Sequence, residues 1–149
     1  MKFYLAYGMN TNLGSMMYRS PASKSLGKVT LEDYAFKFKY HADAEYSPGK
    51  SMECAIWSIT DDCERSLDNL EGYPYYYEKK MVPVEFQGKI VEAMIYYMVS
   101  DYKTPSRPSQ NYYDMVIQGY YQHEMDTNIL HRAYEETLDI DIIDISAYN

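Results

Sequence analysis

The sequence predicts one α+β domain in which amphipathic helices pack against a mainly antiparallel sheet. Residues 34–40 alternate aromatic side chains with Ala and Lys, the period-two pattern of a half-buried strand. Residues 80–86 and 89–99 are two further strand-like runs, and Gln87-Gly88 between them indicates a hairpin. Residues 59–71 carry apolar side chains at helical spacing instead. A chain of 149 residues suffices for one core, so we expect a single domain, 1–149.

The remaining elements follow in chain order. We expect a strand at 2–7, a helix after it, a polar loop at 20–28, a strand at 52–59, a loop at 100–109, and helices at 111–125 and 128–137. Asn10 or Thr11 would cap the first helix, which would bury Leu13, Met16 and Met17.

Two segments have less regular patterns. Residues 41–50 are polar and end in Ser47-Pro48-Gly49, which predicts a turn. Residues 138–145 alternate Asp and Ile, which predicts a late strand or an edge segment. The aspartates of this tail would form a solvated face that charge protects from pairing.

The composition narrows the classes of partner and compartment. The 19 tyrosines suit a polar-lined cavity or an adhesive surface. A net charge of −8 without a basic cluster argues against nucleic acid or an anionic membrane as a partner. Cys54 and Cys63 match neither a metal site nor a disulfide framework, and Met1–Met9 lacks the features of a signal peptide. We therefore expect a cytoplasmic protein with no nucleic-acid or membrane partner. Association as a homodimer is left open.

One carboxylate ends a predicted helix in an unusual position. The helix begins at Asp61 or Asp62 and stops at Gly72, whose permissive backbone suits a helix end. Glu71 lies four residues after Leu67, at the edge of the apolar stripe and at the negative end of the helix dipole. Burial and the dipole both raise a carboxyl pKa, as a general acid or base near neutral pH requires. A solvated Glu that only ends a helix is the alternative. The predicted apolar face comprises Ile59, Cys63, Leu67 and Leu70.

A second stretch, Tyr7-Gly8-Met9-Asn10, predicts an anion site. A strand runs here through a glycine turn into a helix start, and such a turn presents free backbone N–H groups. The Gly-x-x-x-x-Gly-Lys-Ser/Thr pattern of a phosphate loop is missing, so a carboxylate ligand suits the turn better. An ordinary surface loop is the alternative.

Together, the tyrosine-glycine-x-asparagine turn and Leu67-Asp68-Asn69-Leu70-Glu71-Gly72 resemble the γ-glutamyl cyclotransferase-like family. Trp57-Ser58-Ile59-Thr60 is similar to that family's strand before its catalytic helix. The resemblance spans about Phe3 to Met125. Its later parts are carried by Tyr77, Val82, Val84, Tyr97, Tyr112 and Gly119.

The resemblance implies a small closed or nearly closed β-barrel with helices outside it, and an acyl-transferring enzyme. Glu71 would be the catalytic acid and base. The family's loop has Ser or Thr where this chain has Met9, so a different substrate is expected if that side chain contributes to substrate choice. The residues that the resemblance assigns to substrate binding are Tyr7, Gly8, Met9, Asn10, Tyr77, Tyr97 and Tyr112.

The expected substrate is a γ-glutamyl peptide or a γ-glutamylamine. Its α-amine attacks the side-chain carbonyl, which closes 5-oxoproline and expels an amine. One carboxylate of raised pKa can move the protons, so no metal or organic cofactor is required. Two alternatives stay open. A non-catalytic module would use the same cavity to hold a small ligand or a protein, and a hydrolase would pair Glu71 with Glu78 or Glu85.

Overall fold

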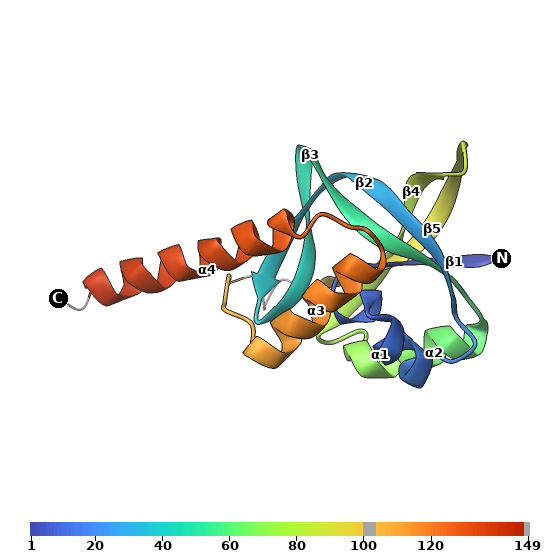
Figure 1. Ribbon diagram of the computed structural model, residues 1–149, viewed down its shortest axis with the longest axis horizontal. Helices are drawn as coiled ribbons and strands as arrows, with labels where there is room; N and C mark the ends of the chain where they lie inside the picture. The colour runs from blue at the N-terminus through green and yellow to red at the C-terminus, as the bar shows by residue number, and fades with distance from the viewer. Residues whose placement is uncertain (100–103, 148–149) are drawn as a thin grey trace.

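Five strands form one sheet in the order β2-β3-β1-β5-β4 (Figure 1). The computed structural model describes residues 1–99 and 104–147, with side chains described as far as residue 138. β1 pairs in parallel with β5, and the other neighbouring pairs of the described sheet are antiparallel. Because β1 and β5 are parallel, their C-terminal ends lie at the same end of the sheet. The glycine turn begins at this end, directly after β1. The strands are β1 Lys2–Ala6, β2 Lys24–Lys39, β3 His41–Ile59, β4 Tyr77–Phe86 and β5 Lys89–Met98.

Helices cover one side of the sheet, and the last helix projects from the body toward the C-terminus (Figure 1). The helices in the described ranges are η1 Met9–Thr11, a 3-10 turn, and α1 Leu13–Arg19, α2 Asp61–Glu71, α3 Gln110–Gln122 and α4 Asn128–Ala147. Leu130, Ala133 and Thr137 are buried and fasten the first half of α4 to the body. The predicted late strand at 138–145 is wrong, because the backbone continues there as α4.

The predicted strand at 34–40 is confirmed as the second half of a longer strand, β2. We expected a loop at 20–28, but β2 already begins at Lys24. Gly27 does not end the pairing with β3, because the register shifts between Ser25 and Lys28 and the strand continues past this irregularity.

The predicted strand at 52–59 is the end of β3, which also includes the polar segment at 41–50. The turn expected at Ser47-Pro48-Gly49 is instead a bulge within the paired strands, opposite a register shift around Asp33. The Gly49 N–H donates to Asp33 Oδ1 at 3.0 Å, and the left-handed φ of 86° at Gly49 suits glycine. Exposed polar side chains are tolerated here because one face of an antiparallel sheet can face water.

The first helix begins later than the sequence predicts. Asn12 caps α1 by accepting the Ser15 N–H at 3.2 Å. The expected caps, Asn10 and Thr11, lie in η1 and are buried. Met16 is buried as predicted. The two side chains of the predicted apolar face that are exposed instead are Leu13 and Met17.

The second helix has the predicted bounds, and Gly72 ends it in the left-handed conformation with φ 67°. Its cap is Thr60, which accepts the Cys63 N–H at 3.1 Å, rather than an aspartate of the first turn. Cys63 and Leu67 are buried, whereas Leu70 is 49% exposed, so the apolar face is narrower than predicted.

The sheet matches the barrel expectation only in part. The β4–β5 hairpin is confirmed, and the buried residues form one hydrophobic cluster. Within the described chain, β2 and β4 are edge strands with no pairing between them. They nevertheless approach each other, because Lys80 Nζ of β4 lies 4.7 Å from the ring centroid of Tyr34 on β2. The barrel is therefore open at this edge.

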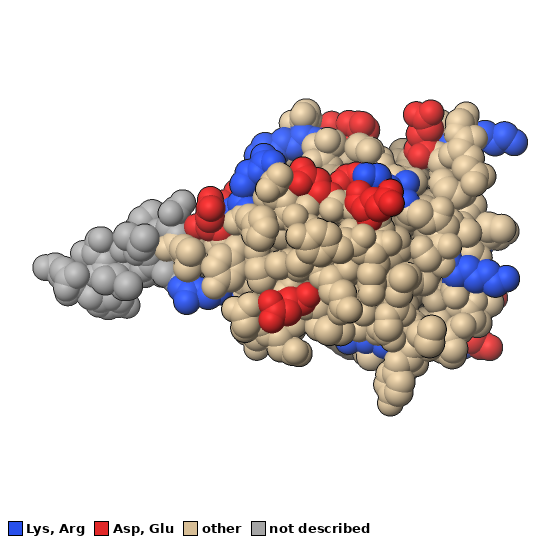
Figure 2. Space-filling view, viewed as in Figure 1, with Lys and Arg blue, Asp and Glu red and all other residues tan. Residues whose placement is uncertain are grey.

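Charges of both signs are interspersed on the face shown in Figure 2. Lys28 pairs with Glu53 at 2.8 Å and Lys37 pairs with Glu136 at 3.0 Å. In the described part of the chain, no helix combines the length and apolar character needed to cross a membrane.

Candidate active site

The glycine turn brings the end of β1 close to β3 and α3. A Cβ at Gly8 would lie 2.9 Å from both the Ala42 Cβ and the Tyr112 hydroxyl oxygen. Real Cβ atoms essentially never make such contacts, so the turn needs glycine for space. The chain then enters η1, where the Thr11 N–H donates to the Gly8 carbonyl at 3.0 Å. Gly8 therefore places Met9 and Asn10 at the base of a cavity.

Helix α3 packs tightly on this turn. A Cβ at Gly119 would lie 2.7 Å from the Asn12 backbone nitrogen. The Tyr120 hydroxyl donates to the Tyr7 carbonyl at 2.7 Å, and Asn12 Nδ2 donates to the Met115 carbonyl at 3.0 Å. The late helix therefore fixes the backbone on both sides of the glycine turn.

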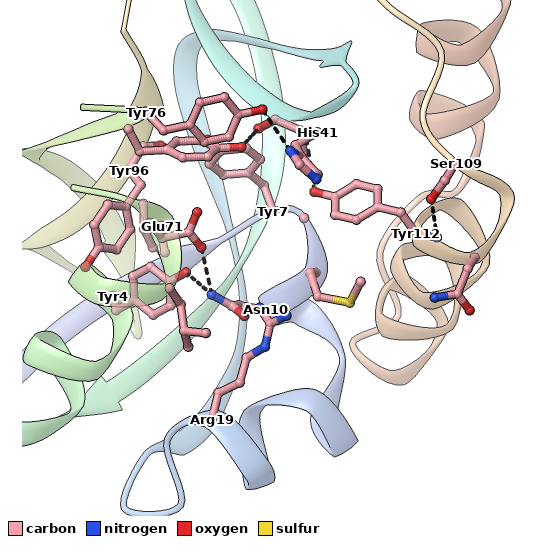
Figure 3. Close-up of a pocket in the computed structure, with 17 residues that line it drawn as sticks. Tyr4, Tyr7, Asn10, Arg19, His41, Glu71, Tyr76, Tyr96, Ser109 and Tyr112 are labelled. Atoms are coloured by element: carbon pink, nitrogen blue, oxygen red, sulfur yellow. Dashed lines mark hydrogen bonds between the residues drawn. The ribbon is translucent and has the colours of Figure 1, made fainter. Parts of the chain in front are cut away.

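Glu71, the last residue of α2, points toward Asn10 (Figure 3). Asn10 Nδ2 donates to Glu71 Oε1 at 3.2 Å and to the Tyr4 hydroxyl at 3.0 Å. Arg19 Nη1 donates to Asn10 Oδ1 at 3.0 Å. Burial raises the pKa of Glu71 from 4.5 to about 7, although the Arg19 charge and the Asn10 hydrogen bond act in the opposite direction. The carboxyl is therefore suited to exchanging protons near neutral pH.

A cavity of about 360 Å³ lies between Glu71 and the glycine turn. The sequence predicts that tyrosines line such a cavity, and the structure places Tyr7, Tyr77 and Tyr112 there with Gly8, Met9 and Asn10. The side chains of the lining that the sequence analysis did not assign to the site are Tyr4, Leu5, Arg19, His41, Ala42, Leu70, Tyr76, Tyr96, Ser109 and Asn111.

The hydroxyls of Tyr7, Tyr77 and Tyr112 differ in whether they already donate a hydrogen bond within the protein. Tyr7 donates to the Tyr96 carbonyl at 2.7 Å, and Tyr77 donates to the Ala42 carbonyl at 2.5 Å. The Tyr112 hydroxyl instead accepts the Ala42 N–H at 3.0 Å, so its own proton is available to a ligand. Burial raises the pKa of all three phenols, which keeps them protonated. Tyr112 is therefore a neutral hydrogen-bond donor.

His41 lies at the opposite side of the cavity from Arg19 (Figure 3). Its Nδ1 is 2.8 Å from the Tyr76 hydroxyl, and its ring packs edge-on against Tyr112. Burial lowers the pKa of His41, so the imidazole is mostly uncharged near neutral pH.

Tyr97, expected in the site, does not line the cavity; its neighbour Tyr96 does. Successive side chains of a strand point to opposite faces, so a shift of one residue along β5 reverses the side. Lys80 Nζ lies 4.4 Å from the Tyr97 ring centroid, which places Tyr97 beside the open edge of the barrel. The Tyr96 hydroxyl donates to Asp68 Oδ1 at 2.6 Å.

Glu71 is the one carboxylate among the described residues that line the cavity. Glu78 and Glu85 are exposed on β4, so the two-carboxylate hydrolase has no second carboxylate here. In the described ranges, no group of three or more His, Cys, Asp or Glu side chains is arranged to hold a metal ion.

The fold and cavity define a small α+β protein with one pKa-shifted carboxyl facing a tight glycine turn. The sequence model of the family described as "Gamma-glutamyl cyclotransferase, AIG2-like" matches residues 4–115. The chain belongs to this family.

Solved structures show the same fold. A structure named γ-glutamyl cyclotransferase superposes with a TM-score of 0.78 at 21% identity, over 89% of this chain and 85% of that chain. A human protein, described as uncharacterized protein loc79017, gives 0.77 at 23% identity over the same shares. YkqA from Bacillus subtilis gives 0.75 at 17% identity, over 91% of this chain and 54% of its own. A search of curated protein sequences found no match.

Proposed function

We propose that this protein is a cyclotransferase that releases 5-oxoproline from a γ-glutamyl peptide or a γ-glutamylamine. One observation carries the proposal: a carboxyl with a pKa of about 7, that of Glu71, faces the glycine turn across a small tyrosine-lined cavity. Such a group is about half ionised near neutral pH, so it can both accept and return a proton. Membership of the family supports the same reaction.

Glu71 moves the protons of the ring closure in this proposal. It takes a proton from the α-ammonium of the γ-glutamyl group, and the freed nitrogen attacks the γ-carbonyl carbon to form the ring C–N bond. The bond from that carbon to the leaving nitrogen then breaks. The attacking nitrogen loses two protons in all, and the leaving nitrogen gains two as it departs as an ammonium ion. Glu71 carries these protons one at a time and ends in its starting state.

Two other groups would hold the substrate while it cyclises. The carbonyl oxygen becomes negatively charged during the attack, and the uncommitted hydroxyl proton of Tyr112 is a donor for it. In this proposal the turn Gly8-Met9-Asn10 holds the α-carboxylate through backbone N–H groups, of which that of Met9 already bonds the Tyr112 hydroxyl. The attack is intramolecular, so holding the chain folded supplies much of the rate.

The test is 5-oxoproline release from γ-glutamyl dipeptides, γ-glutamylamines and glutathione, compared between wild type and Glu71→Gln. We expect release by the wild type and a loss of at least about 10²-fold in kcat for the variant, since acid–base catalysis contributes about 10²–10⁴-fold. Glu85→Gln, an exposed glutamate outside the cavity, is the matched control and should keep the wild-type rate.

The binding-module alternative makes a different forecast for the same experiment. A module that only holds its ligand would release no 5-oxoproline, and Glu71→Gln would bind that ligand as tightly as the wild type. Release that is equally fast in wild type and Glu71→Gln would show that Glu71 is not the catalyst.

A further inference from the structure

Arg19 is the one Lys or Arg among the described residues that line the cavity. It is the last residue of α1, and its side chain extends toward Asn10 and the cavity (Figure 3). The Ser66 hydroxyl of α2 donates to the Arg19 carbonyl at 2.9 Å, so the backbone of α1 is fastened to the helix that carries Glu71. The Arg19 side chain is half-buried and hence partly shielded from water.

The guanidinium of Arg19 has no carboxylate partner within 4.0 Å in the part of the chain that the structure describes. Among the described residues, its side chain donates one hydrogen bond, to Asn10 Oδ1 at 3.0 Å. A guanidinium carries five N–H donors in a fixed fork that fits a carboxylate, so most of this fork is free for a ligand. Glu71 lies beyond 4.0 Å and interacts with this charge only at longer range, so the half-buried guanidinium still favours an anionic ligand group in direct contact.

The substrate of the proposed reaction contains two places for such an anion. One is the α-carboxylate of the glutamyl group, which the proposed function assigns to the glycine turn. The other is the amine that leaves, which carries a carboxylate if it is an amino acid. Asn10 lies between Glu71 and Arg19. Its side chain donates a hydrogen bond to Glu71 at 3.2 Å and accepts one from Arg19 at 3.0 Å. The guanidinium therefore lies one side chain away from the carboxyl that protonates the leaving nitrogen.

We infer that Arg19 selects substrates whose leaving group carries a carboxylate, namely γ-glutamyl amino acids, over γ-glutamylamines. This inference rests on the proposed function and identifies the leaving group that it leaves open. The cavity of about 360 Å³ is near the lower end for small-molecule sites, which suits a dipeptide. His41, at the other side, is mostly uncharged at neutral pH and does not compete for the carboxylate.

The decisive substrates are γ-glutamyl-alanine and γ-glutamyl-alaninamide, which differ in the terminal carboxylate and are nearly equal in size. We expect the wild type to favour the acid in kcat/KM. Arg19→Gln should reduce the acid-to-amide ratio of kcat/KM by about 10- to 100-fold, the usual effect of losing a charge-assisted contact. Arg65→Gln, an exposed arginine of α2 outside the cavity, should leave the ratio unchanged.

Two results would overturn the inference. An equal loss on both substrates would mean that Arg19 serves the shared glutamyl part or only positions Asn10. An unchanged ratio in Arg19→Gln would mean that the guanidinium does not meet the leaving group. Arg19→Lys separates charge from geometry, and partial recovery of the ratio in this variant supports a charge contact.

A binding measurement separates this inference from the proposed function. In the Glu71→Gln background, calorimetry compares the affinity of γ-glutamyl-alanine and its amide with and without Arg19→Gln. Selective weakening of the acid supports Arg19 as the selector, even if the wild type proves to have no turnover and the proposed reaction fails. Equal affinities for acid and amide in Glu71→Gln overturn the inference, whatever the wild-type turnover.

Discussion

Glu71 is buried at the C-terminus of a helix. This environment affects the stability of the folded protein as well as the acid–base chemistry of the carboxyl. Its pKa of about 7, against an ordinary 4.5, means that the folded protein holds this proton more tightly than the unfolded chain. The cost to stability is absent below pH 4.5, where both states are protonated. It grows between pH 4.5 and 7 and is fully present above pH 7.

We therefore predict that Glu71→Gln raises the free energy of unfolding at pH 8 but not at pH 4. The pKa difference corresponds to at most about 3 kcal/mol. Urea denaturation of both proteins at the two pH values measures it. A stability difference between the two proteins that stays the same from pH 4 to pH 8 would contradict the raised pKa.

Met9 is the second residue whose side chain makes a testable difference. It lines the cavity, at the position where the sequence resemblance leads us to expect Ser or Thr. Met9→Ser adds a hydroxyl and removes apolar volume at the cavity wall. We predict a change in the order of preferred γ-glutamyl substrates, with little change in the melting temperature. A substrate panel with the same ranking for both proteins would show that only the Met9 backbone matters.

Among the contacts between elements, that of α3 with η1 leaves no room for a side chain at Gly119. We predict that Gly119→Ala destabilises the protein by about 1–3 kcal/mol, because its Cβ would overlap Thr11 and the Asn12 backbone. Activity should fall as well, since α3 holds the glycine turn. Gly14→Ala is the control. A Cβ at Gly14 meets only Asn12 Oδ1 at 3.4 Å, an ordinary contact, so this helical substitution should be neutral or stabilising.

Most elements could be predicted from periodicity, and the errors have local causes. Helix α2 and the β4–β5 hairpin were predicted because spacing and turn residues agreed. Strands β2 and β3 were each predicted too short and were not predicted to pair as a hairpin, because the loop signals at 20–28 and at Ser47-Pro48-Gly49 are overridden by long-range pairing. Alternating Asp and Ile at 138–145 indicated a strand, yet the backbone there is helical.

The candidate site could be predicted where a motif marks it. Glu71 and the glycine turn carry such motifs, and the structure brings them to one cavity. Tyr97 was predicted to line the cavity, but Tyr96 does so. Which face of the sheet a side chain occupies depends on the strand register, and the sequence leaves that register undetermined. Arg19 and His41 had no local signal. Each reaches the cavity through the packing of an element far from Glu71 in sequence.

At the scale of the whole molecule, the cavity is lined from β1, η1, α1, β3, α2, β4, β5 and α3. A ligand that binds only this assembled cavity stabilises the folded chain by about 2.7 kcal/mol at 100 times its Kd. We predict that 5-oxoproline raises the melting temperature by roughly 5–10 °C at that concentration, in one cooperative transition. Calorimetry tests this, and a transition that splits in two with ligand would contradict a single cooperative unit.

The hydrogen bond from Tyr120 to the Tyr7 carbonyl also has a consequence for synthesis. It joins residues 113 positions apart, and Asn12 is joined to Met115 across 103 positions. At the usual rate of synthesis of 5–20 residues per second, helix α3 is made roughly 5–20 seconds after the glycine turn. For the last 49 of those 113 positions the nascent chain already contains Glu71, but the cavity around it is not yet complete. The proposed activity therefore requires that synthesis has passed Tyr120 and that α3 has packed against the glycine turn.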